Sequence, residues 1–403
     1  MLRIRLHWQI LIALFLGILY GIYLTDYVNY ISWMGELFLR ALKMIIVPLI
    51  LSSIISGVAN IGNAENLGRL GLKTIGYYIM TSIFAILTGL ILVNIFQPGV
   101  GADLGFSKEV EDLAVATESF GSTLLNIIPT NIFTAFVEGN MLSIIFFSII
   151  FGFFITKTKT KYRNFLGDFF NATFSVMMKL TMFVIRFTPL GVFGIVALQV
   201  SESTDIVNLA QRMGLYMLVV ISALFIHAFI TLPLITRIIG RAHPWKHLRN
   251  LSTPLLTAFS TSSSSATLPL TMEAVEHNDG VSNKITSFTL PLGATINMDG
   301  TALYECVAAM FIAQAYGVDL SFGQQIIVVI TALLASIGAA GIPMAGLVMI
   351  SIILTAVGLP LEGVGLILAV DRILDMFRTA TNVWSDSCGA VIIAKSEGEK
   401  LKV

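Results

Sequence analysis

Residues 260–265 read Ser-Thr-Ser-Ser-Ser-Ser, six consecutive hydroxyl-bearing side chains inside a moderately apolar stretch that runs from 251 to 271. A helix that spans a bilayer would not present so many hydroxyls to lipid, and serine and threonine compete with helical hydrogen bonds. Non-helical backbone at membrane depth is tolerated only where it is buried in protein or lines a wet cavity. The run therefore predicts a re-entrant helical hairpin over 250–277, with its tip near Ser264.

Two further apolar stretches are interrupted in the same third of the chain. Residues 338–343 read Gly-Ala-Ala-Gly-Ile-Pro within a stretch from about 325 to 359, and residues 297–300 read Asn-Met-Asp-Gly within one from about 286 to 316. Paired interrupted segments mark the binding site in many transporters. We expect a second hairpin over 322–359, whose tip near Gly341 meets the first tip, and a span unwound at Asn297–Gly300.

The composition indicates that lipid is the solvent of this chain. Of its 403 residues, 56% are hydrophobic and 12% are charged, with a mean hydropathy of +0.86, whereas a soluble domain is about 25% charged. A net charge of +0 argues against a nucleic-acid partner. The two cysteines, Cys306 and Cys388, have neither metal-ligand nor disulfide spacing. We find no nucleophile–base set either, and expect neither an enzyme nor a bound cofactor.

The apolar runs before the hydroxyl run are each long enough to cross a bilayer, which takes roughly 20 residues. They cover 8–24, 31–59, 74–97, 124–156, 165–200 and 213–239. Alternate loops are basic, so the positive-inside rule places the N-terminus in the cytoplasm, and the first run is expected to be a span and not a cleaved signal peptide. Lysines in the tail place the C-terminus on the same side. With a last span over 362–394, the sequence predicts an all-α polytopic protein of the cell membrane, with eight transmembrane helices and two re-entrant hairpins.

A stripe of polar side chains runs along the last span. At helical intervals of three and four, it consists of Asp371, Asp375, Arg378, Thr379, Asn382 and Asp386. Such residues share one helix face, and a charge at the bilayer centre costs about 2.5–3.5 kcal/mol. The stripe is therefore expected to face the protein interior. One interpretation is a purely structural ion-pair ladder around Arg378, and the other is a binding site.

The chemistry of the stripe suits an acidic amino acid. Arg378 offers a planar fork that binds a carboxylate at two points, and Asp375, one turn earlier, can accept from an ammonium group. Asp386 is a candidate ligand for a hard cation, which prefers oxygen. A C4-dicarboxylate is the alternative solute, but it would leave Asp375 unpaired. A gated channel is disfavoured because groups of both signs are arranged for one zwitterion.

Four motifs in order resemble the glutamate transporter family, the dicarboxylate/amino acid:cation symporters. They are Ser-Ser-Ser-Ser-Ala-Thr-Leu-Pro at 262–269, Asn-Met-Asp-Gly-Thr at 297–301, Ser-Ile-Gly-Ala-Ala-Gly-Ile-Pro at 336–343 and the stretch 375–386. The resemblance covers nearly the whole chain and is that of a prokaryotic member. It implies import of L-glutamate or L-aspartate, coupled to sodium, protons or both.

The resemblance also implies the site residues. The expected substrate contacts are Ser263, Ser264, Thr301, Ile342, Gly346, Asp375, Arg378, Thr379 and Asn382. The first expected sodium site uses the carbonyls of Gly293 and Asn382 with Asp386. A second site uses backbone oxygens of Thr295, Ser336, Ile337 and Ala339. The third uses Tyr78, Thr81 and Ser82 with Asn297 and Asp299.

The family architecture implies a homotrimer that works as an elevator. A scaffold is expected from 1–60 and 121–205, and a mobile transport domain from 74–97 and 211–403. One departure concerns an arginine: archaeal relatives carry it where this chain has Ser262, and animal relatives where it has Met376. Glu305 matches the glutamate that animal relatives use as a proton carrier. Proton coupling, added to sodium or replacing it, is therefore expected to run through Glu305.

Overall fold

The chain is helical throughout the part that the computed structural model describes, with no β-strand in that part. The described residues are 6–62, 68–102, 128–138, 140–202, 206–338 and 345–403. Among them, the helices long and apolar enough to cross a membrane are Ser32–Ala59, Arg69–Phe96, Thr160–Ile185 and Val207–Ile238. This agrees with the predicted class of multi-pass membrane protein, while the count of eight crossings stays a prediction.

The described residues of the first half of the chain are mostly helical. The helices are α1 (Leu6–Tyr23), η1 (Thr25–Tyr30), α2 (Ser32–Gly62), α3 (Gly68–Phe96), α5 (Ile132–Glu138), α6 (Met141–Lys157), α7 (Thr160–Ile185) and α8 (Thr188–Glu202). The apolar run 165–200 is thus two helices and not one. The chain turns at Arg186 and Phe187, and Pro189 falls in the first turn of α8, where its missing N–H is not needed.

The second half contains more and shorter elements. They are α9 (Ile206–Ile226), η2 (His227–Thr231), α10 (Leu232–Ile238), α11 (Pro244–Asn250), α12 (Ser252–Thr261), α13 (Ser264–Ala274), η3 (Val275–Asp279), α14 (Asn283–Ile296), α15 (Asp299–Ala315), α16 (Phe322–Gly338), α17 (Ala345–Ala356), η4 (Leu361–Gly363) and α18 (Val364–Ser396). The element η2 is a π-helical turn within the continuous helix α9–α10, and such turns are frequent at functional sites.

Two of the predicted interruptions are confirmed. Between α12 and α13, Ser262 adopts a left-handed conformation with φ of 51°, and the Ser263 hydroxyl caps α13 by accepting a bond of 3.2 Å from the Ala266 amide. The tip of the first hairpin is therefore Ser262–Ser263, just before the expected Ser264. Asn297 and Met298 separate α14 from α15. The expected second tip at Gly341 lies outside the described residues.

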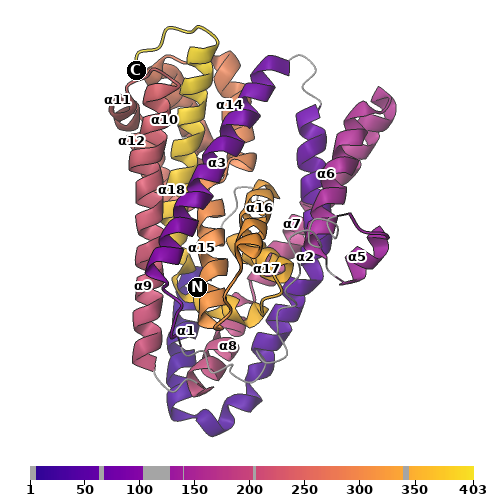
Figure 1. Ribbon diagram of the computed structural model, residues 1–403, viewed down its shortest axis with the longest axis vertical. Helices are drawn as coiled ribbons and strands as arrows, with labels where there is room; N and C mark the ends of the chain where they lie inside the picture. The colour runs from indigo at the N-terminus through magenta and orange to yellow at the C-terminus, as the bar shows by residue number, and fades with distance from the viewer. Residues whose placement is uncertain (1–5, 63–67, 103–127, 139, 203–205, 339–344) are drawn as a thin grey trace, which may run out of the picture.

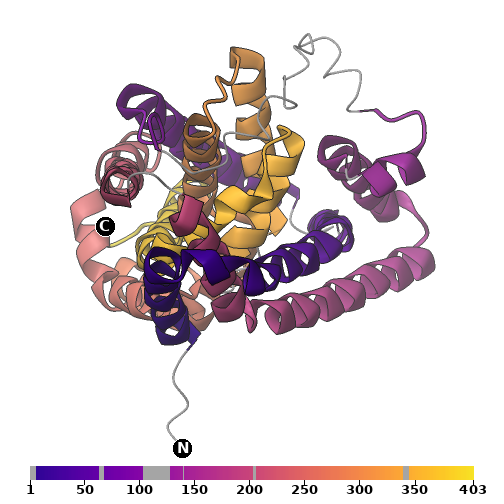
Figure 2. The same cartoon turned by 90° about the horizontal axis from the view of Figure 1, so that it is seen from below.

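Most helix contacts fall within two sets, which meet through the pair α16–α17 and through contacts of α18 with α1 and α8. α2 packs on α6, α7 and α8, and α1 packs on α8; in the other set, α15 and α18 pack on each other and on α3 and α9. Figure 1 shows α2 and α6 on the right, α9 and α18 on the left, and α1 and α8 below α15, and in Figure 2 the magenta helix α7 lies along the edge of the molecule. The pair α16–α17 contacts both α15 and α2.

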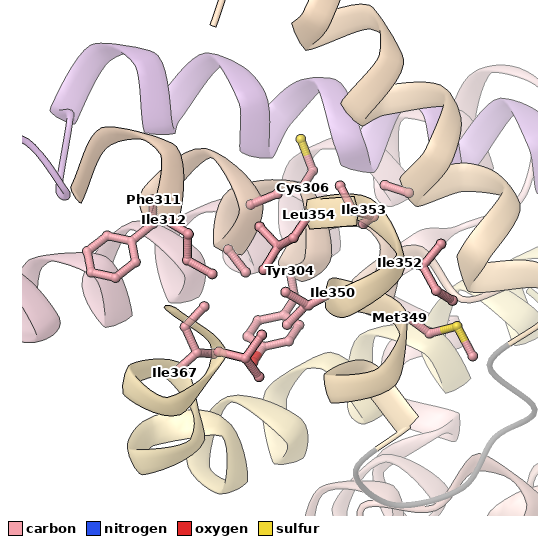
Figure 3. Close-up of a cluster of buried hydrophobic side chains, with 14 of the residues drawn as sticks. Tyr304, Cys306, Phe311, Ile312, Met349, Ile350, Ile352, Ile353, Leu354 and Ile367 are labelled. Atoms are coloured by element: carbon pink, nitrogen blue, oxygen red, sulfur yellow. The ribbon is translucent and has the colours of Figure 1, made fainter. Parts of the chain in front are cut away.

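The helix α15 forms the centre of the interior. Every residue from Asp299 to Ala313 is buried. Figure 3 shows side chains of α15, α17 and α18 in one apolar cluster, among them Tyr304, Ile353 and Ile367. Because α15 is enclosed by other helices, its side chains face protein and not lipid, and Asp299 and Tyr304 bond to polar groups of neighbouring helices.

Candidate substrate and cation site

Arg378 is a buried cation held by two carboxylates of its own helix. Its side chain is 2% exposed, its Nε donates to Oδ1 of Asp375 at 2.8 Å, and its Nη1 lies 3.1 Å from Oδ1 of Asp371. The stripe on α18 thus faces the interior, as expected, and forms the ion-pair ladder that one interpretation foresaw. A buried charge needs such partners, because an unpaired one would cost several kcal/mol.

Tyr304 of α15 completes the surroundings of this cation. Its hydroxyl donates to Oδ1 of Asp371 at 2.7 Å, and its ring lies 4.4 Å from Cζ of Arg378, a cation–π distance. Sequence reasoning missed Tyr304. The available signal was its position three residues after Thr301, since such neighbours share a helix face.

Two glycines bring neighbouring helices close to Arg378. A Cβ at Gly346 of α17 would lie 2.5 Å from Nη1 of Arg378, and one at Gly300 would lie 2.5 Å from the Arg378 carbonyl oxygen. Only a residue without a side chain fits at these points. The start of α15 and the start of α17 therefore both approach the arginine.

Asn382 links α18 to the start of α15. Its Oδ1 accepts from the Gly300 amide at 2.7 Å, and its Nδ2 donates to Oγ1 of Thr301 at 3.1 Å. Thr379, one turn before, is also buried. Of the predicted substrate contacts, the structure brings together Thr301, Gly346, Asp375, Arg378 and Asn382.

The remaining predicted substrate contacts belong to the two hairpins. Ser263 and Ser264 stand at the start of α13, which packs on α18. Ser264 is buried with 4% of its surface exposed, and the bond from the Ala266 amide to Ser263 is local. Ile342 lies outside the described residues.

Asp299 is the centre of a cluster of buried oxygens. Its Oδ1 accepts from Ser82 at 2.6 Å and lies 3.4 Å from Oγ1 of Thr81, which is equally far from Oδ1 of Asn297. These residues come from α3, α15 and the break before α15. Oxygen-rich clusters suit hard cations, so the residues predicted for the third sodium site lie together, except that Tyr78 directs its hydroxyl to the Thr289 carbonyl at 2.7 Å.

Two further side chains contact Asp299 that sequence reasoning did not place there. The Ser385 hydroxyl donates to Oδ2 at 2.6 Å, and Nε2 of His227 lies 3.1 Å from the same atom. Both His227 and Asp299 are fully buried. The partner of the buried His227 imidazole is thus a predicted cation ligand. No pattern links residues 72 positions apart, although Ser385 is adjacent to the predicted Asp386.

A second group forms around Asp386. Its Oδ1 accepts from Nδ2 of Asn297 at 2.9 Å. A Cβ at Gly293 would lie 2.5 Å from the same oxygen and 2.8 Å from the Tyr78 hydroxyl. The residues predicted for the first sodium site, Gly293, Asn382 and Asp386, therefore lie on facing stretches of α14 and α18, which pack together.

The predicted backbone-oxygen site is described only in part. Thr295 is near the end of α14, and Ser336 and Ile337 are in the last turn of α16; these two helices pack on each other. The Ser336 hydroxyl donates to the Leu333 carbonyl at 2.8 Å. Ala339 lies outside the described residues.

Comparison with known proteins identifies the family. A model of the sodium:dicarboxylate symporter family matches residues 6–396. The chain belongs to the sodium:dicarboxylate symporter family.

Individual relatives match over almost the whole chain. The Escherichia coli proton/glutamate-aspartate symporter is 38% identical, with 98% of this chain and 94% of the relative covered. The Geobacillus stearothermophilus proton/sodium-glutamate symport protein is 38% identical, over 99% and 96%. Human excitatory amino acid transporter 3 is also 38% identical, over 97% and 85%. The name of the first protein states the proton as coupling ion, and the name of the second states proton and sodium.

Glu305 has an unusual setting for an acid in this sodium:dicarboxylate symporter family member. It lies on α15, one turn after Thr301, and is fully buried. Within the described part of the chain neither of its carboxyl oxygens has a hydrogen-bond partner, and the opposite charge that acts on it is Arg378. Buried acids without partners are costly when ionised, which suits a group that carries a proton.

The two positions that the family resemblance singled out for an arginine have no basic side chain in this chain. Ser262 is buried at the first hairpin tip, and Met376 is half-buried on α18. Two guanidinium groups of α18 approach Asp375: that of Arg378 is buried, and that of Arg372 lies 3.7 Å from Oδ2 of Asp375 and is 30% exposed.

Proposed function

We propose that the chain is a secondary active symporter that imports L-glutamate or L-aspartate together with sodium, protons or both. The names of the relatives in the sodium:dicarboxylate symporter family support this proposal. The observation that carries it is the buried pair of Arg378 and Asp375, which faces α15 and α17 and not lipid.

Substrate binding requires this pair to change partners. Nε of Arg378 donates to Oδ1 of Asp375 at 2.8 Å. An acidic amino acid brings one ammonium group, which would pair with Asp375, and a side-chain carboxylate, which would pair with Arg378. Each buried charge then keeps an opposite charge, so the exchange avoids the cost of an isolated ion. A C4-dicarboxylate cannot supply the ammonium group and is the less favoured substrate.

The α-carboxylate has its own candidate partners. The start of α13 carries free backbone N–H groups and the positive end of a helix dipole, which suit an anion. Ser264 and Thr301 offer hydroxyls. We assign the substrate contacts to the set predicted from sequence, including Ile342 and the backbone near Gly346.

Coupling cations fit the three oxygen groups. The Asp299 cluster with Tyr78, Thr81, Ser82 and Asn297 is the most complete of them by hydrogen-bond contacts. The Asp386 group and the ends of α14 and α16 are the other two. We assign proton transport to Glu305, since its partnerless burial favours the neutral acid.

The proposed mechanism is an elevator in a homotrimer in the cell membrane, with eight crossings, two hairpins and both termini cytoplasmic. The packing supports it: α1, α2, α5, α6, α7 and α8 would belong to the scaffold, and α3 and the helices from α9 onward to the transport domain. The pair α16–α17, which touches both sets, would be the gate that slides against α2.

Proteoliposome uptake tests the proposal. Purified full-length protein should accumulate labelled glutamate or aspartate when a sodium or proton gradient is imposed separately, and Arg378→Ala should lose acidic uptake while a neutral amino acid is admitted. Uptake of succinate in preference to both amino acids would establish the rival substrate. Unchanged glutamate uptake by Arg378→Ala would refute the role of the arginine.

A further inference from the structure

A cavity of about 240 Å³ lies between α9, α12 and α18, apart from the substrate and cation residues. Its walls include Phe225 of α9, Phe229 of η2, Leu255 and Phe259 of α12, and Phe377 and Ala380 of α18. The two polar groups in the walls are already used: Thr381 donates to the Phe377 carbonyl at 2.9 Å, and the Trp384 indole to the Ala228 carbonyl at 2.9 Å. The cavity therefore presents apolar surface to any occupant.

The cavity opens where lipid is expected. α9 belongs to the membrane span Val207–Ile238, and the rim side chains Leu256, Phe225 and Phe229 are 70%, 46% and 41% exposed. Water gains nothing in an apolar cavity without polar partners. In a bilayer the available apolar occupant is an acyl chain.

A short basic helix stands at one end of the cavity. On α11, Leu248 and Arg249 follow Trp245 at intervals of three and four, so both lie on its side of the helix. Leu248 forms part of the cavity wall, Trp245 is 53% exposed and Arg249 is exposed. Trp at such a level is typical of the membrane interface, and basic pockets between membrane helices bind anionic headgroups. The charge at this end complements a phosphate.

We propose that this groove binds one anionic phospholipid, with an acyl chain in the cavity and its phosphate at Arg249. The chain would lie along α18 from Phe377 to Trp384, seven residues or about 10 Å of helix. Such a lipid would hold α12, the first arm of hairpin 1, against α9 and α18. The lipid would fix the position of α12 without touching Arg378 or the cation groups.

Native mass spectrometry of the purified full-length protein tests the proposal, with phosphatidylglycerol or phosphatidylcholine added back after delipidation. The wild-type protein should retain phosphatidylglycerol in preference to phosphatidylcholine. Ala380→Phe, which fills the cavity, should lose the bound lipid, while Ile91→Phe on the exposed side of α3 should retain it. Arg249→Gln should weaken phosphatidylglycerol binding by about fivefold, and Lys161→Gln on α7 should not.

A second measurement covers the case in which Ala380→Phe misfolds. Wild-type protein in vesicles that contain phosphatidylglycerol with a photoreactive acyl chain should be labelled on α12 and α18 within the cavity walls. Equal binding of the two lipids by wild type, undiminished binding by a folded Ala380→Phe, or labelling confined to other helices would each overturn the proposal.

Discussion

Gly346 of α17 packs directly on the guanidinium of Arg378 in α18: a Cβ on the glycine would lie 2.5 Å from Nη1 and 3.1 Å from both Cζ and Nη2. The arginine is simultaneously held by Asp375 and Asp371. The second hairpin therefore touches the proposed substrate-binding cation through a residue that has no side chain, and any group added there must displace the arginine or the hairpin.

Gly346→Ala should consequently impair acidic amino acid uptake. Overpacking of a buried contact costs about 1–3 kcal/mol, which corresponds to roughly 5- to 150-fold in an equilibrium constant. We expect the half-saturating glutamate concentration in proteoliposomes to rise within that range. Gly214→Ala on α9 is the control, since a Cβ there has no neighbour within 4 Å. An equal effect of both substitutions would mean that helix flexibility, and not the arginine contact, is responsible.

Tyr304→Phe should destabilise the ion-pair ladder while keeping the ring under Arg378. The substitution removes the 2.7 Å hydrogen bond to Asp371, and hydrogen bonds to charged groups are worth about 1.5–3 kcal/mol. Thermal melting of the detergent-solubilised protein should show a lower transition temperature, and uptake should fall. Tyr316→Phe, at the end of the same helix, is the comparison, and we expect it to lose less stability than Tyr304→Phe. A larger loss of stability in Tyr316→Phe would contradict this prediction.

The sequence allowed the interrupted helices to be predicted because their breaks are local chemistry. Six hydroxyls in succession, or Asn, Asp and Gly within an apolar run, disfavour a continuous helix wherever the chain places them. The stripe on α18 was predictable for the same reason, since charges within a span must face protein. In both cases the residue types alone decide the outcome.

The partners across helices could not be predicted from pattern alone. That Tyr304 meets Asp371 and that His227 meets Asp299 depends on the rotation of α15 and α9 about their axes. The periodicity of a helix that is buried on all sides, as α15 is, does not specify that rotation. The roles of Thr81 and Ser82 were predicted from the family resemblance, because the sequence pattern alone did not indicate them.

Ser82→Ala should raise the sodium requirement of transport. The hydroxyl bonds to Oδ1 of Asp299 at 2.6 Å, and its loss removes both a candidate cation ligand and a bond that orients the carboxylate. With about 1.5–3 kcal/mol for a bond to a charged group, the half-activating sodium concentration should rise at least about tenfold. Thr88→Ala, farther along α3 with its hydroxyl on the Phe84 carbonyl, should leave it unchanged. If uptake proves independent of sodium in wild type, the cluster does not bind sodium.

Glu305→Gln should separate proton from sodium coupling. Glutamine cannot carry a proton but has nearly the same shape, so the variant should fold and bind substrate. Uptake driven by an imposed pH gradient should be abolished, whereas exchange of internal for external glutamate should continue. Glu138→Gln, at the exposed end of α5, is the control. Proton-driven uptake that persists in Glu305→Gln would show that another group carries the proton.

Glu397 joins the end of α18 to the start of α3 and should make stability depend on pH. Hydrogen bonds from Arg69 at 2.5 Å and Lys73 at 2.6 Å lower the pKa of its carboxyl from 4.5 to about 2. A folded-state pKa below the unfolded value stabilises the protein above about pH 4.5, and that contribution is lost as pH falls towards 2. The melting temperature of wild type should therefore be higher than that of Glu397→Gln at neutral pH. The difference between the two melting temperatures should become smaller below pH 4.5. Added salt should also reduce this difference in melting temperature, because the ion pairs of Glu397 are at the surface. A difference that stays constant from neutral pH to about pH 3 would show that the ion pairs do not cause it.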